Sequence, residues 1–437
     1  MKHPIQFVIR EHKKNSSKGI YSVCSANRFV LQAAMKQAQE DQSLLLVEAT
    51  SNQVDQSGGY TGMTPIDFRN YVASIAKENN FHSYSLILGG DHLGPNVWQD
   101  KPSDIAMKNA LDQIRAYIKA GFTKIHLDAS MPLADDESDP EKPLDPLVVA
   151  RRSAELCKAA EDMYHNMPAN ETEPVYVIGT DVPVPGGART SREDIRITPV
   201  QEVEEIIALT QQEFLNKGLE NAWNRVVAVV VQPGVEFGDD AISAYNPRKA
   251  RQLSYYIAGN PQLVYEAHST DYQLPGALKQ MVEDHLAILK VGPWLTYAFR
   301  EAVFSLATIE EELSVLLKSI SPSNIIETLD HAMTDDPRYW IKYYQGNEVH
   351  KSFARKYSLS DRIRYYWPQQ KVEKALEKLM NNLQNHPFPL TLLSQYMPSQ
   401  YQALRSGHLT SHPLELIHHK IREVLKIYST ATGMNEK

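Results

Sequence analysis

The chain has few of the features that mark secreted, membrane-spanning or nucleic-acid-binding proteins. Its 437 residues include only two cysteines, Cys24 and Cys157, which are most simply explained as reduced thiols in a reducing compartment. No apolar run reaches the roughly 18 residues of a membrane helix, and residues 1–19 contain no signal-sequence-like apolar stretch. The net charge of -8 argues against nucleic acid or an anionic membrane as the main partner. We therefore expect a cytoplasmic protein with neither of these partners.

Two glycine-rich phosphate-binding motifs are also missing. No G-x-G-x-x-G string follows the first strand-like segment, which argues against a dinucleotide-binding fold. No G-x-x-x-x-G-K-[ST] loop occurs in the chain either, which argues against a nucleotide-dependent kinase.

What the sequence does contain is a regular alternation of short apolar runs with amphipathic helical segments. The runs are rich in Val, Ile and Leu, as is typical of strands that are buried on both faces of a parallel sheet. Eight of them occur within about 300 residues, at 19–26, 44–50, 86–92, 124–130, 174–180, 226–232, 263–269 and 287–293. Eight such units fit a closed (βα)₈ barrel better than an open doubly wound sheet.

The C-terminal part of the chain has a different pattern. Residues 318–437 contain helical and loop segments but no paired strand-like runs. We expect a barrel domain over residues 1–317 and a helical extension over residues 318–437 that packs on the barrel.

Polar residues gather where the predicted strands end. The string GGDHLGP (89–95) places an acid and an imidazole directly after an apolar run. Comparable polar strings end most of the other strands, namely EATSNQ, HLDAS, GTDVPVPGG, VQPGVEF and YEAHSTD. In a (βα)₈ barrel the carboxyl ends of the strands surround one mouth, where catalytic residues lie.

These strand ends hold the side chains of a divalent-metal site. Imidazole with carboxylate suits Zn²⁺ or a similar ion, which would polarise a carbonyl and stabilise an enediolate. Asp91 is then placed to move a proton. The residues that can converge at the mouth are His92, His126, Asp128, Asp181, Glu236, Glu266 and His268.

A structural interpretation competes with the metal site. A single His or Asp at a strand end can cap a neighbouring helix. Asp128 can likewise have a purely structural role, as a hydrogen-bond acceptor within its loop. Capping alone is a poor explanation for so many polar strand ends on one face of the barrel.

A phosphate group is a second expected ligand. In such barrels phosphate usually binds near the loops after strands seven and eight and at the start of the next helix. Here these loops contain Ser269, Thr270 and Gly292.

Long strings in this chain resemble the GatZ/KbaZ family, the second-component subunits of class II D-tagatose-1,6-bisphosphate aldolase. The resemblance extends from about residue 5 nearly to the C-terminus. It is carried by VEATSNQVDQSGGYTGMTP, GGDHLGPNVW, KIHLDAS, VPVPGG, VVQPGVEF, EAHSTDYQ, ILKVGP and YSLSDRIRYYWP. It implies a TIM barrel, a place in galactitol, N-acetylgalactosamine or galactosamine catabolism, and a complex with a separate catalytic aldolase subunit. Family members are regarded as non-catalytic alone but necessary for the activity and stability of that partner, and some carry an older kinase label.

The barrel also resembles the catalytic class II aldolases at Asp91 and His92, where those enzymes have a catalytic Asp followed by a metal-binding His. Their other two metal histidines follow strands six and seven. Strand six of this chain ends without a histidine, and after strand seven Glu266 takes the ligand position while His268 is displaced by two residues. Either the metal is lost, or Glu236 and Glu266 replace the imidazoles.

We therefore expect a helper subunit of the aldolase, whose partner is the catalytic class II subunit and whose mouth can bind a sugar phosphate. The alternative is a free-standing metal-dependent ketose-phosphate aldolase or epimerase. The expected catalytic residues are Asp91 and Asp181. The expected ligands of Zn²⁺ or another divalent metal are His92, Glu266, His268 and Glu236. The expected substrate-binding or phosphate-binding residues are Ser269, Thr270, Gly292, Asp128 and Gln232. Residues 365–367 are expected either at the partner interface or inside the chain's own fold.

Overall fold

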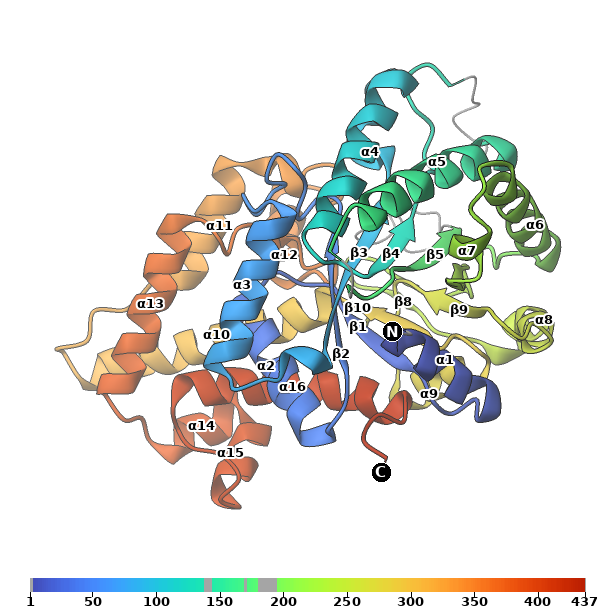
Figure 1. Ribbon diagram of the computed structural model, residues 1–437. Helices are drawn as coiled ribbons and strands as arrows, with labels where there is room; N and C mark the ends of the chain where they lie inside the picture. Colours follow the sequence, from blue (N-terminus) through green and yellow to red (C-terminus); the bar gives the residue numbers. More distant parts are fainter. Residues whose placement is uncertain (1–2, 137–143, 169–170, 180–194, 437) are drawn as a thin grey trace.

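The computed structural model describes residues 3–136, 144–168, 171–179 and 195–436. Within these ranges, eight parallel strands close into a barrel (Figure 1). In order around the wall they are β1 (Ile20–Val23), β2 (Leu45–Thr50), β3 (Leu86–Leu93), β4 (Lys124–Leu127), β5 (Val175–Gly179), β6 (Val226–Val230), β9 (Val264–Ala267) and β10 (Ile288–Val291). Each strand lies in one of the eight apolar runs, so the predicted (βα)₈ barrel is confirmed.

Amphipathic helices surround this barrel. Side-chain caps begin two of them: the side chain of Asn27 accepts hydrogen bonds from the first turn of α2, and Thr64 and Asp67 form a capping box at the start of α3. The helices up to residue 317 are α2 (Arg28–Asp41), α3 (Pro65–Glu78), α4 (Ser103–Lys119), α5 (Pro146–His165), α6 (Val200–Asn216), α7 (Glu220–Trp223), α8 (Pro247–Ala258), α9 (Pro275–Glu283) and α10 (Pro293–Leu316).

The helices after residue 318 gather on one side of the barrel, where Figure 1 draws them in orange and red. They are α11 (Ile325–Asp335), α12 (Glu348–Tyr357), α13 (Gln370–Asn385), α14 (Leu390–Tyr396), α15 (Pro398–Arg405) and α16 (Pro413–Ala431), with a 3₁₀ turn at Arg362–Tyr365. The last helix, α16, packs against α2, α9 and α10. Its Tyr428 hydroxyl donates a hydrogen bond to the carbonyl of Thr270, which follows β9. The C-terminal region thus supplies a helix of the barrel's outer layer, and the division into domains at residue 317 stays a prediction.

Two smaller elements were not anticipated. Helix α1 (Pro4–Lys14) covers the amino-terminal end of the barrel, where Ile5 and Ile9 pack against the first residues of several strands. A short antiparallel pair, β7 (Glu236–Phe237) with β8 (Ile242–Ser243), follows β6. In the part of the chain that the structure describes, no helix is both long enough and apolar enough to cross a membrane.

Candidate functional site

The glycines of GGDHLGP make room for charged side chains and for a neighbouring strand end. A Cβ atom on Gly89 would lie 2.7 Å from Cγ of Glu48 and 3.3 Å from Cδ of Lys124, so these two buried side chains meet over the glycine. A Cβ atom on Gly94 would lie 1.7 Å from the carbonyl oxygen of Asp128. The glycines therefore let three strands bring their polar residues together.

A bulge in β3 turns two consecutive side chains toward the same space. The pairing of β3 with β4 shifts register between Gly90 and Leu93, and His92 has a φ of 49°. Side chains on a regular strand alternate between its two faces, whereas a bulge can redirect one of them. Asp91 and His92 consequently both face the interior, with 3% and 6% of their surfaces exposed.

Three imidazoles and one carboxylate meet at this point. Asp91, His92, His126 and His268 each offer a possible metal-ligand atom, and all four atoms lie within 4.8 Å of one another. The ring centroids of the histidines are 4.7 to 5.3 Å apart. The four residues come from β3, from β4 and from the turn after β9.

Hydrogen bonds determine which nitrogen of His126 faces the cluster. Its Nε2 lies 3.0 Å from the carbonyl of Gly179, which can only accept, while its Nδ1 lies 3.2 Å from the backbone N–H of His92, which can only donate. His126 therefore carries a proton on Nε2, and the lone pair of its Nδ1 accepts from the backbone N–H of His92. Oδ1 of Asp91 lies 3.1 Å from Nδ1 of His126 and 2.9 Å from Nζ of Lys290, which is the cation beside it.

His92 is oriented by Asp128 from the next strand end. Its Nδ1 lies 2.7 Å from Oδ2 of Asp128, which also accepts from Asn96. Burial lowers the pKa of His92, but Asp91 and Asp128 outweigh this effect and raise the pKa to about 9. A carboxylate that holds one imidazole nitrogen while the other faces a cluster is a common support of metal-bound histidines.

His268 has the opposite pKa shift. Burial lowers its pKa to about 4, even though its Nε2 lies 3.0 Å from Oε1 of Glu266. A neutral imidazole at neutral pH is the form that binds a metal ion.

A network of ion pairs lies directly below the imidazoles. Nζ of Lys124 is 2.9 Å from Oε1 of Glu48 and 2.7 Å from Oε2 of Glu266. Nζ of Lys290 contacts Glu48 and lies 2.9 Å from Oδ1 of Asp91. Burial raises the pKa of Asp91, but Lys290 and the neighbouring histidines outweigh this effect and hold the pKa well below its usual value.

The structure brings together only some of the residues that the sequence selected as metal ligands. His92 and His268 share the cluster, whereas Glu266 pairs with Lys124 and Glu236 accepts a hydrogen bond from Ser269. The predicted catalytic residue Asp91 belongs to the cluster, while Asp181 lies outside the described residues.

The backbone amides expected to bind phosphate have an internal partner. The N–H groups of Gly292 and Trp294 both donate to Oδ1 of Asp271, at 3.0 and 2.8 Å. Thr270 donates to the carbonyl of Lys290, and the side-chain oxygen of Gln232 accepts from the amides of Gly234 and Val235. Each of these predicted binding residues therefore already takes part in hydrogen bonds within the chain.

Sequence reasoning did not select the two internal lysines or include His126 among the proposed metal ligands. The signal lay in the alternation of KIHLD, in which Lys124, His126 and Asp128 share one face of the strand. Lys290 in ILKVG is likewise a lone charge within an apolar run.

The cluster fits a divalent ion by its donor set. Three imidazoles and a carboxylate suit Zn²⁺, and Asp128 supports His92. A metal ion would have to displace the proton that His92 holds at its raised pKa and the hydrogen bond from the N–H of His92 to Nδ1 of His126. The ammonium of Lys290 opposes a further positive charge there, because it neutralises Asp91.

Comparisons with known proteins identify the family of this chain. Residues 5–433 match the family model described as D-tagatose-1,6-bisphosphate aldolase subunit GatZ/KbaZ-like. A structure from Sinorhizobium meliloti 1021, described as a probable tagatose 6 phosphate kinase, is 40% identical, with a TM-score of 0.86 over 95% of this chain and 100% of that one. The YdjI aldolase from Escherichia coli K12 is 13% identical, with a TM-score of 0.41 over 86% of this chain and 96% of that one. The chain therefore belongs to the GatZ/KbaZ-like family of D-tagatose-1,6-bisphosphate aldolase subunits.

Proposed function

We propose that this chain is a helper subunit, which stabilises a separate catalytic class II aldolase subunit and raises its activity. The observation that carries the proposal is the position of Lys290, whose ammonium lies 2.9 Å from Oδ1 of Asp91 inside the histidine cluster. Burial lowers the pKa of Lys290, but Asp91, Glu266 and Glu48 outweigh this effect and raise the pKa well above its usual value. Asp91 is thus paired with the permanent positive charge of Lys290, whereas a catalytic metal would need this carboxylate to be free.

The assembled complex would cleave D-tagatose 1,6-bisphosphate reversibly into glycerone phosphate and glyceraldehyde 3-phosphate. We place this reaction in the cytoplasm, in galactitol or N-acetylgalactosamine catabolism. A subunit that binds only the folded partner stabilises that partner by mass action, without a catalytic group of its own.

Residues 365–367 are not required for the interface with the catalytic subunit, because they have packing partners within this chain. Tyr365 stacks on Tyr339 with ring centroids 4.7 Å apart, and Trp367 packs edge-on against Phe299 at the same distance. These aromatic side chains therefore pack within the chain's own fold. Exposed apolar side chains that a partner would be expected to bury lie on α12, where Val349 and Phe353 are 77% and 63% exposed.

Mixing the chain with the separately purified catalytic subunit tests the proposal. We expect a higher melting temperature and a longer active half-life of the catalytic subunit, and no turnover by this chain alone. Phe353→Ser reports on the α12 surface, and Tyr84→Ser, which removes another exposed aromatic ring, is its control. An unchanged catalytic subunit on mixing would contradict the helper role.

A second candidate function is a free-standing metal-dependent aldolase or epimerase acting on a ketose phosphate. The three-imidazole cluster favours it, because His92, His126 and His268 can hold a divalent ion while Asp91 moves a proton. The bound metal would polarise the substrate carbonyl and stabilise an enediolate. Stoichiometric metal in the purified chain, together with turnover that His92→Ala abolishes, would establish this function in place of the helper role.

A kinase role has no support from the site. The chain contains no G-x-x-x-x-G-K-[ST] phosphate loop, and the amides at the start of α10 are bound to Asp271.

A further inference from the structure

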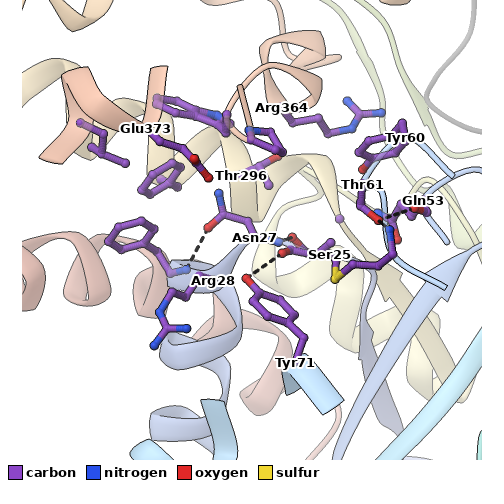
Figure 2. Close-up of a pocket in the computed structure, with 18 of the residues that line it drawn as sticks. Ser25, Asn27, Arg28, Gln53, Tyr60, Thr61, Tyr71, Thr296, Arg364 and Glu373 are labelled. Carbon is purple, nitrogen blue, oxygen red and sulfur yellow. Dashed lines mark hydrogen bonds between the residues drawn. The ribbon is translucent and has the colours of Figure 1, made fainter. Parts of the chain in front are cut away.

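A cavity of about 740 Å³ lies between the barrel mouth and the C-terminal helices. Its walls come from the turn between β1 and α2, from the start of α10, and from α13 (Figure 2). Small-molecule sites usually have volumes of roughly 300 to 1,000 Å³. The cavity is therefore large enough for a complete small ligand.

Aromatic rings form much of the wall. Phe29 and Phe299 stack with ring centroids 4.8 Å apart, and Trp367 packs against Phe299. Tyr71 completes this side, where its hydroxyl donates to the carbonyl of Ala26. Flat aromatic faces pack well against the C–H faces of a sugar or polyol.

Polar side chains also line the cavity. Glu373 and Glu377 lie one turn apart on α13, and neither carboxylate has a hydrogen bond or ion pair with any residue that the structure describes. Oδ1 of Asn27 caps α2, which leaves its amide group to line the cavity (Figure 2). The lining thus offers two strong acceptors and an amide donor.

The two arginines of the lining donate hydrogen bonds within the chain, and only Arg28 does so to a carboxylate of a described residue. Arg28 pairs with Glu78. Arg364 donates to the carbonyls of Ser360 and Asp361 and to the hydroxyl of Tyr365. With two unpaired carboxylates at its edge, the cavity is unfavourable for a phosphate group.

We propose that this cavity binds an uncharged polyhydroxylated small molecule, a free sugar or sugar alcohol. Its hydroxyl groups would donate to Glu373 and Glu377 and accept from the amide of Asn27, while its carbon skeleton packs on the partly exposed rings of Phe29 and Tyr71. The site selects against phosphorylated sugars, which are the substrates of the aldolase to which the family belongs. The cavity would therefore give the subunit an effector site for unphosphorylated sugar. Binding to this site can be tested without aldolase activity.

Titration calorimetry with the full chain tests this inference, with fructose and sorbitol as neutral probes and fructose 6-phosphate as the anionic one. We expect saturable binding of at least one neutral probe and weaker binding of fructose 6-phosphate. Glu373→Ala and Glu377→Ala should each weaken binding about tenfold to a hundredfold, as loss of one hydrogen bond to a charged group implies.

The matched control is Glu348→Ala, which removes a side chain that is 80% exposed from α12, outside the cavity. Circular dichroism of each variant checks that it is folded. The inference is overturned if no neutral probe binds saturably, if fructose 6-phosphate binds as tightly as the neutral probes, or if both α13 variants bind like Glu348→Ala.

Discussion

Lys290 on β10 and Asp91 on β3 form an ion pair, 2.9 Å from Nζ to Oδ1, that crosses the inside of the barrel above β1 and β2. Lys124 on β4 spans the barrel in a similar way between Glu48 and Glu266. Together these contacts tie strands that are not neighbours in the wall, and they hold Asp91 against the imidazoles of the candidate site.

We predict that Lys290→Met lowers the free energy of unfolding by about 3–5 kcal/mol, the usual effect of removing one partner from a buried ion pair. Glu48 and Asp91 would then be left with negative charges that lack this partner. Urea denaturation measures the change, and Lys279→Met, at an exposed lysine on α9, is the matched control.

The double variant Lys290→Met with Glu48→Gln separates charge from packing. Because it removes one buried charge of each sign, it should recover part of the loss. If the double variant loses as much unfolding free energy as the two single variants together, the ion pair is not the cause of the loss in Lys290→Met.

The second prediction concerns the close approach of Gly94 to the end of β4. A Cβ atom there would lie 1.7 Å from the carbonyl oxygen of Asp128, so Gly94→Ala must displace Asp128 and with it the hydrogen bond to His92. We expect a loss of about 2–3 kcal/mol in stability, at the upper end of the cost of overpacking. Gly276→Ala on α9, where a Cβ atom would meet nothing within 4 Å, should be neutral or slightly stabilising. Equal stability of the two variants would contradict the proposed contact.

Much of the fold could be predicted because strands buried on both faces leave runs of Val, Ile and Leu that stand out between amphipathic helices. The convergence of Asp91, His92 and His268 followed from the same fact, since parallel strands end at one mouth. The partners of these residues could not be predicted. The pairing of Lys124 with Glu48 and Glu266 depends on the register of strands that lie far apart in the sequence, and the inward turn of His92 depends on a bulge.

The packing position of α16 could not be predicted from the sequence either. Its apolar face predicted a helix, but only the folded chain places Tyr428 against Thr270 after β9. The sequence also could not show that a side chain binds the backbone amides expected to bind phosphate. Asp271 accepts hydrogen bonds from two of these amides.

The third prediction is a loss of stability at alkaline pH. Folding raises the pKa of His92 from 6.5 to about 9, so the folded state binds this proton more tightly than the unfolded state. The resulting stabilisation is complete below pH 6.5 and is lost as the pH rises through 9. Its size is about 3 kcal/mol at most, from the energy equivalent of a pKa shift of this size.

Urea denaturation at a series of pH values between neutral and alkaline measures this effect. His92→Asn should remove that part of the pH dependence, whereas His82→Asn, at an exposed histidine, should leave it intact. If the wild type and His92→Asn lose stability in parallel over this range, His92 is not protonated in the folded state.

The last prediction tests whether Asp271 occupies an anion site. Its carboxylate accepts from the amides of Gly292 and Trp294 at the start of α10, and burial raises its pKa to about 6. Asp271→Ala would free these amides, and the nearby charge of Arg364 would then favour an external anion. We expect inorganic phosphate to raise the melting temperature of Asp271→Ala at constant ionic strength more than it raises that of the wild type. Asp271→Asn keeps an acceptor for the amides and should respond like the wild type, so an equal response of all three proteins would mean that the amides do not form an anion site.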